Sequence, residues 1–104
     1  MILYNVTISI ENDIHDEFIQ WMLTEHIPEV MSTQLFVEYK LLRMLQAEEE
    51  AQGLTTYAVQ YYLKGLEDFV QYSQHHAPEL QAKTRQKYGE RVLAFRTLLE
   101  VVHP

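Results

Sequence analysis

The sequence predicts an α+β fold, and two observations support this prediction. Apolar and polar residues alternate in residues 2–10 and 55–63, as in β-strands, whereas apolar residues after each of these segments recur every three or four positions, as in helices. The chain also contains an internal repeat, because residues 18–21 (FIQW) and 25–30 (EHIPEV) return as 69–72 (FVQY) and 75–80 (HHAPEL). A repeat of about 50 residues indicates two related halves of one architecture.

The first half begins with a strand that is followed by a helix. Residues 2–10 alternate between apolar and mostly polar side chains, which predicts a strand with one buried face. Asn12 and Asp13 favour a helix N-cap, so a helix is expected to begin there. Its buried stripe is expected to consist of Ile14, Phe18, Trp21 and Met22. Pro28 lacks a backbone N–H, so we expect the helix to kink or restart there, with Glu29 in a final short turn.

Two strands joined by a turn are expected in the middle of the chain. Residues 35–46 are rich in apolar and aromatic side chains and predict the second strand. Residues 47–54, which include Gly53, predict the turn. Residues 55–63 alternate again and predict the third strand.

The second half closes with a helix and a strand. An apolar stripe that starts at Leu66 predicts a helix that Pro78 interrupts and that continues to Lys87. Gly89 suits a C-terminal cap, so the helix is expected to end there. Residues 92–102 predict the last strand, with apolar side chains on both parities.

The predicted order β-α-β-β-α-β indicates one ferredoxin-like domain over residues 1–104, with a four-stranded antiparallel sheet and two helices on one face. The other face is expected to be mixed in polarity and to consist of Leu3, Asn5, Thr7, Ser9, Ala58, Gln60, Tyr62, Ala94, Arg96, Leu98 and Glu100. Such a face suits burial against a second subunit. We therefore expect a homodimer in which two sheets face each other as a dimeric α/β-barrel.

The composition argues against several classes of function. The 104 residues include no cysteine, which excludes disulfides and zinc-thiolate sites. The formal charge of −7, with scattered Lys and Arg, argues against nucleic acid as a partner. No membrane span and no signal peptide are recognisable, so we expect a cytoplasmic protein without membrane association. No metal or cofactor is expected, because His75 and His76 point about 100° apart on a helix and cannot share an ion.

Several motifs resemble an uncharacterised bacterial family of domains of unknown function. They extend over most of the chain and are YNVT at 4–7, DEFIQW at 16–21, EHIPEV at 25–30, KLLR at 40–43, YAVQY at 57–61, AP at 77–78 and AFRTLLE at 94–100. The family is related to the dimeric α/β-barrel superfamily, which includes cofactor-free monooxygenases, lactone isomerases, haem-degrading and chlorite-dismuting enzymes, and stress-responsive or ligand-sensing domains. The resemblance implies a ferredoxin-like dimer, selects no reaction among these, and transfers no catalytic residue.

The residues before Pro28 are the first candidate site. His26 can act as a general base near neutral pH, and the carboxylates of Glu25 and Glu29 beside it could orient its ring. Glu25 follows Phe18 by seven residues and is expected to point toward the sheet, where burial would raise its pKa. Glu25 and His26 are therefore candidate catalytic residues. The alternative is structural, because Pro28 and Glu29 favour the start of a helical segment.

A second set of candidates could bind a small molecule and consists of Trp21, Tyr57, Tyr61, Tyr72, His76 and Arg96. The aromatic members could position an aromatic ligand, although their spacing also suits a hydrophobic core. His76 has the same place before Pro78 as His26 has before Pro28, which favours a structural role for both. Arg96 could hold a carboxylate or phosphate.

The alternative for the charged residues is dimer registry. Arg43 and Glu100 occupy equivalent positions of the repeat on the two edge strands. If both face the partner sheet, they would form a salt bridge between subunits.

We consider three functions. The preferred one is small-molecule binding or a regulatory role, and the alternatives are a cofactor-independent enzyme of monooxygenase or isomerase type on a small aromatic substrate and a purely structural dimerisation module. An enclosed pocket of about 300 Å³ or more between the helices and the sheet, with Glu25 or His26 projecting into it, would favour the enzyme. The first copy of the repeat has one more residue before its proline than the second, and a local function is expected where the copies differ.

Overall fold

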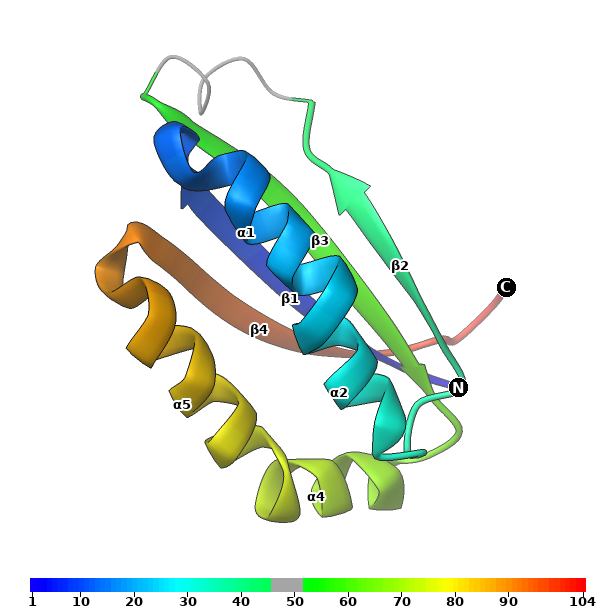
Figure 1. Cartoon of the computed structure of the whole chain (residues 1–104). Helices are drawn as coiled ribbons and strands as arrows, with labels where there is room; N and C mark the ends of the chain where they lie inside the picture. The colour runs from blue at the N-terminus through cyan, green and yellow to red at the C-terminus, as the bar shows by residue number, and fades with distance from the viewer. Residues whose placement is uncertain (46–51) are drawn as a thin grey trace.

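The computed structural model describes residues 1–45 and 52–104 and has the element order β-α-β-β-α-β, in which each helical segment is divided (Figure 1). The strands are β1 (Ile2–Glu11), β2 (Glu38–Arg43), β3 (Leu54–Leu63) and β4 (Val92–Glu100). The helices are α1 (His15–Trp21), α2 (Ile27–Ser32), α4 (Leu66–His75) and α5 (Ala77–Tyr88). Within the described ranges, no helix is long and apolar enough to cross a membrane.

The strands form one antiparallel sheet in the order β2-β3-β1-β4. β1 lies inside the sheet and pairs with β3 on one side and with β4 on the other. The helices cover a single face of this sheet (Figure 1). The predicted ferredoxin-like arrangement is therefore confirmed.

The core lies between the helices and the sheet. The even-numbered residues of β1 from Ile2 to Ile10 are buried, as the alternation predicts. Tyr4 stacks on Phe36 and on Tyr61, with ring centroids 6.4 and 6.1 Å apart. Phe36 precedes the shorter strand β2, although the sequence predicts a strand from residue 35 to residue 46. Residue 46 and most of the predicted turn at 47–54 lie outside the described residues.

The first helical segment continues through a π-helical turn, Met22–His26, that separates α1 from α2. The backbone N–H of Ile27 donates to the carbonyl of Met22, five residues earlier. A π turn accommodates one more residue than an α turn. It therefore contains the extra residue that the first copy of the repeat has before its proline, and Pro28 lies in the first turn of α2 as expected.

The second helical segment is joined differently. α4 ends at His75, α5 begins at Ala77, and His76 between them has φ −127°. The interruption expected at Pro78 is confirmed. Both copies nevertheless stack a histidine on the equivalent aromatic ring, with centroids 5.1 Å apart for Trp21 and His26 and 6.4 Å apart for Tyr72 and His76.

The start of the first helix differs from the prediction, whereas the end of the last helix agrees with it. Asn12–Ile14 form a 3-10 turn before α1, and the Asn12 side chain caps no helix. Its Oδ1 instead accepts a hydrogen bond of 2.6 Å from Thr55 Oγ1 on β3. Gly89 has φ +59° and ends α5, as expected, because glycine adopts this conformation without a steric cost.

The register of β4 exchanges the expected faces of this strand. Arg96 lies opposite Val6, and Glu100 lies opposite Ile2, whose side chains face the helices. The prediction that the open face of the sheet includes four residues of this strand is therefore wrong for Ala94, Arg96, Leu98 and Glu100. Since both parities of the strand are apolar, alternation could not decide its facing, and a shift by one residue exchanges the two faces.

The open face is consequently more apolar at β4 than expected. Leu93, Phe95 and Leu99 lie on it with exposed fractions of 60%, 64% and 45%. Phe95 lies opposite Thr7, in a row that continues across the sheet to Leu42. Exposed apolar side chains therefore lie at both edges of this face, on β4 and at Leu42 on β2, with Thr7 and Ala58 between them.

The structure does not support the salt bridge that was expected between Arg43 and Glu100 across a dimer of facing sheets. Arg43 lies opposite Tyr57, on the helix face of β2, and Glu100 lies on the helix face of β4. Neither side chain faces the open side of the sheet.

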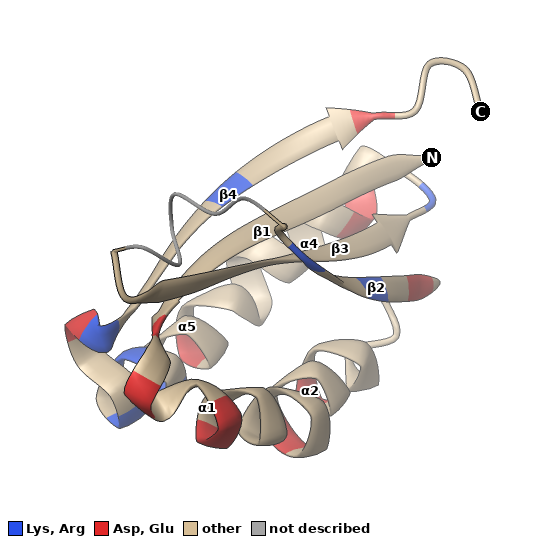
Figure 2. Ribbon diagram, turned by 90° about the horizontal axis from the view of Figure 1, so that it is seen from above, with Lys and Arg blue, Asp and Glu red and all other residues tan. Residues whose placement is uncertain are grey.

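Ion pairs join elements that are distant in the sequence. Lys83 on α5 donates to Glu29 on α2 over 2.7 Å, and Arg91 after α5 contacts Glu11 over 3.1 Å and also pairs with Asp13. Figure 2 shows acidic residues along α1 and α2 and basic residues on α5 and the turn after it. The pairs hold α5 beside α2 and beside the end of β1.

Candidate functional site

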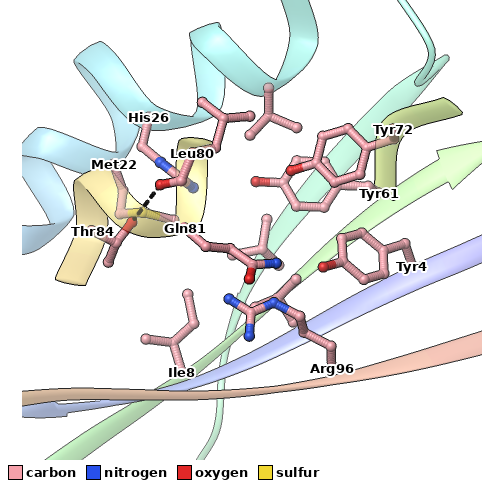
Figure 3. Close-up of a pocket in the computed structure, with 13 residues that line it drawn as sticks. Tyr4, Ile8, Met22, His26, Tyr61, Tyr72, Leu80, Gln81, Thr84 and Arg96 are labelled. Atoms are coloured by element: carbon pink, nitrogen blue, oxygen red, sulfur yellow. Dashed lines mark hydrogen bonds between the residues drawn. The ribbon is translucent and has the colours of Figure 1, made fainter. Parts of the chain in front are cut away.

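A small cavity with a partly polar and partly apolar lining lies between the helices and the sheet, with a volume of about 40 Å³. Its polar lining comes from Tyr4, His26, Tyr61, Tyr72, Gln81 and Arg96, and Thr84 adds a hydroxyl. Figure 3 shows these side chains converging on the cavity from the sheet on one side and the helices on the other. We call this space the inner cavity.

The fold explains why these side chains meet. Tyr4 and Tyr61 are direct neighbours across β1 and β3, and Arg96 extends from the helix face of β4. Gln81 and Thr84 are three residues apart, so they share one face of α5. Segments from both copies of the repeat therefore contribute to the inner cavity.

The π turn brings His26 to the inner cavity. An extra residue in a helix rotates the following positions by about 100°, so the inward position moves from the seventh to the eighth residue after Phe18. His26 takes this position and is largely buried, whereas Glu25 is exposed. The prediction that Glu25 points toward the sheet is wrong for this reason.

Burial keeps the tyrosines of the inner cavity uncharged near neutral pH. It raises the pKa of Tyr61 and of Tyr72 above the usual range, so both remain protonated. Burial also raises the pKa of Tyr4, although Arg96 and Gln81, which reach its hydroxyl, act in the opposite direction. The tyrosines are therefore neutral hydrogen-bonding groups.

His26 is also uncharged near neutral pH. Burial lowers the pKa of His26 to about 4, and Arg96 and Lys83 act in the same direction, while Glu29 opposes them. Trp21 stacks on the His26 ring, with ring centroids 5.1 Å apart. The ring can donate one hydrogen bond and accept another.

A larger groove adjoins the inner cavity on its open side. It has a volume of about 410 Å³ and lies between α5 and β4. Gln81, Thr84 and Arg96 line both spaces, so these three side chains lie at the boundary between the groove and the inner cavity. We call this space the outer groove; its walls also include Val92 and Ala94.

The structure brings together half of the candidate residues. His26, Tyr61, Tyr72 and Arg96 line the inner cavity.

The other candidates lie elsewhere. Trp21 and Glu25 line a shallow surface depression, and His76 lies at the seam between α2 and α5. Tyr57 contacts His15: the hydroxyl oxygen of Tyr57 lies 2.7 Å from Nε2 of His15.

Three polar residues of the inner cavity were not among the candidates. Tyr4 could have been found, because a phenol on the buried parity of β1 needs a polar partner. Gln81 and Thr84 are ordinary polar residues of a helix, and only the three-dimensional structure places them opposite Arg96. Among the described residues, no group of three His, Cys, Asp or Glu side chains could hold a metal ion.

Solved structures with the same fold cover nearly the whole chain. An ethyl tert-butyl ether D (EthD) family protein from Bacillus halodurans matches with a TM-score of 0.66 and 14% identity, over 96% of this chain and 98% of that one. A dimeric ferredoxin-like protein from an uncultured marine organism matches with a TM-score of 0.60 and 12% identity, over 99% and 96%. A hydroxynitrile lyase from Passiflora edulis matches with a TM-score of 0.57 and 18% identity, over 99% and 97%. At these identities the matches show the fold alone.

The sequence itself matches one family. No curated protein is similar enough to count as a match. The sequence model of a domain of unknown function, DUF4286, matches residues 1–102. The chain therefore belongs to the DUF4286 family.

Proposed function

We propose that this protein binds a small organic anion between α5 and β4, with Arg96 holding the carboxylate or phosphate of the ligand. One observation supports this above the others: Arg96 extends between the outer groove and the inner cavity and lines both. None of the described residues of the inner cavity is acidic. A guanidinium with neutral hydrogen-bonding groups around it is suited to binding an anion.

The two halves of the repeat differ at the position of Arg96. Tyr39 precedes Leu41 and Leu42 as Arg96 precedes Leu98 and Leu99. In the first half, Tyr39 packs on Tyr61, with ring centroids 6.4 Å apart. In the second half, the equivalent position holds a cation beside an open groove. The site thus lies where the duplicated halves have diverged.

Replacing Arg96 by methionine is expected to abolish ligand-induced stabilisation. A panel of small carboxylates and phosphate monoesters is screened by thermal unfolding against the unmodified protein. A ligand at ten times its Kd stabilises the native state by about 1.4 kcal/mol, which raises the Tm of a domain of this size by about 5 °C. Arg96→Met should lose this shift, because methionine keeps the length of the side chain but not its charge.

Arg85→Met is the matched control, because Arg85 lines the outer groove but not the inner cavity. This variant should retain most of the shift. A panel in which no compound raises the Tm, or in which Arg96→Met responds as the unmodified protein does, would exclude the proposed site.

We also propose that the protein is a homodimer that buries the open face of its sheet. Two observations support this. Leu93 and Phe95 on β4 are exposed apolar side chains on that face, and one of the proteins with a similar fold is dimeric. Apolar patches of this kind mark interaction surfaces.

Phe95→Glu should convert the dimer into a monomer, because a carboxylate within an apolar interface is buried without a partner. Sedimentation velocity at micromolar concentration measures the change. Val70→Glu on α4 is the control: Val70 is also exposed but lies on the helical side. A monomeric unmodified protein at this concentration would refute the dimer.

Binding is favoured over catalysis by the properties of His26. It is the base candidate that lines the inner cavity, but a histidine with a pKa of about 4 is a weak base at neutral pH. The inner cavity holds only about 40 Å³, and the larger outer groove is lined by neither His26 nor Glu25. The enzyme, the structural dimerisation module and the cytoplasmic location stay predictions from the sequence.

A further inference from the structure

We propose that the ligand is a monocarboxylate with an apolar body and with a hydroxyl or oxo group on the carbon next to the carboxylate. The carboxylate would bind Arg96, the apolar body would lie in the outer groove, and the adjacent oxygen would enter the inner cavity. This inference rests on the proposed function, because it takes Arg96 as the anion-binding group.

The sizes of the two spaces support this division of the ligand. The outer groove holds about 410 Å³, whereas the inner cavity holds about 40 Å³. A single water molecule requires about 10–15 Å³ measured in the same way. The inner cavity therefore accommodates a substituent of at most about three heavy atoms, but not a ring.

The charges favour a single negative charge on the ligand. Arg96 is the one cation among the described residues of the inner cavity. Farther out, the groove includes Arg85 and Glu90, whose charges are opposite. The two spaces together thus carry one net positive charge. A carboxylate matches it, whereas a phosphate monoester carries about −1.5 to −2 at neutral pH.

The chemistry of the walls assigns the parts of the ligand. Val92 and Ala94 give the outer groove an apolar wall along β4. The inner cavity also has apolar walls, but in addition it presents the hydroxyl groups of Tyr61 and Tyr72 and the neutral ring of His26. An oxygen atom there can accept and donate hydrogen bonds, whereas a hydrogen atom in its place leaves these groups without a ligand partner.

Three compounds that differ in one group each test the inference. They are 4-methylpentanoate, 2-hydroxy-4-methylpentanoate and the neutral 2-hydroxy-4-methylpentanamide, and their Kd values are measured by protein-observed NMR titration. We expect the hydroxy acid to bind at least about tenfold more tightly than 4-methylpentanoate, which corresponds to one good hydrogen bond. The amide should bind more weakly than either acid.

The variant His26→Phe tests whether the oxygen enters the inner cavity. Phenylalanine keeps the size and the stacking of the ring but removes both nitrogen atoms. The preference for the hydroxy acid should fall, while the Kd of 4-methylpentanoate should not change. Tyr72→Phe, which removes a single hydroxyl group from the same wall, provides an independent test if His26→Phe does not fold.

The outcomes separate the inference from the proposed function. Equal affinity for the two acids, or a preference that survives both variants, would overturn the assignment of the adjacent oxygen and leave anion binding at Arg96 intact. Binding of the amide as tight as that of the hydroxy acid would instead overturn the role of Arg96. The role of Arg96 would also be overturned if none of the three compounds binds and no compound of the anion panel raises the Tm.

Discussion

Replacing Phe18 by alanine should lower the free energy of unfolding by about 3–5 kcal/mol, the range observed for large-to-small changes at buried aromatic positions. Phe18 is 1% exposed, and its ring packs edge-on against Tyr88 with centroids 5.0 Å apart and against Trp21 at 6.0 Å. The cavity left by the ring cannot close easily, because these neighbours belong to α5 and α1, which other contacts fix. Urea denaturation followed by circular dichroism measures the loss.

Phe69→Ala is the matched control, because Phe69 occupies the same place in the second copy of the repeat. Phe69 is only partly buried, and it contacts Tyr4 with ring centroids 5.1 Å apart. The loss should be about half of that for Phe18→Ala, since less apolar surface is withdrawn from water. Equal losses for the two variants would show that burial of Phe18 does not dominate the packing of this layer.

The second large effect should be a loss of stability in mild acid that depends on His26. Its pKa is about 4 in the native state, against about 6.5 in the unfolded chain. Between these values the unfolded state binds more protons, so stability decreases as the pH falls from about 6.5 to about 4. The decrease due to this histidine alone should be about 3 kcal/mol between pH 7 and pH 4.

His26→Gln isolates this contribution, because glutamine is polar but does not titrate. Carboxylates also titrate in this range, but they do so in both proteins and cancel in the difference. The free energy of unfolding is measured by urea denaturation at several pH values, and the curve of the variant should be flatter by about 3 kcal/mol over the range. Parallel curves would mean that His26 is accessible to protons in the native state.

The strands β1 and β3 and both divided helices could be predicted from the sequence, because one face of each is apolar and the spacing is regular. The facing of β4 could not be predicted. Its two parities are similarly apolar, and only pairing with β1 decides that Arg96 faces the helices. The start of β2 was also misjudged, since Phe36 is buried in the core before the strand begins.

The candidate site was predicted in part. The extra residue before Pro28 was visible in the sequence, but its effect depends on how the helix accommodates it. A continuous α-helix would have directed Glu25 inward, whereas the π turn directs His26 there. Gln81 could not be predicted, because its role arises from the distance between α5 and β4 and not from any local pattern.

The alternation of β4 has a consequence for the behaviour of the protein as a whole. Phe95 and Arg96 are adjacent on one strand and point to opposite sides of the sheet. Phe95 lies on the face proposed to associate with a second copy, and Arg96 lies in the site proposed to bind the anion. A displacement of this strand would therefore move both the open face of the sheet and the proposed anion site. If a bound anion strengthens self-association by some factor, self-association must strengthen anion binding by the same factor, because binding free energies are reciprocal.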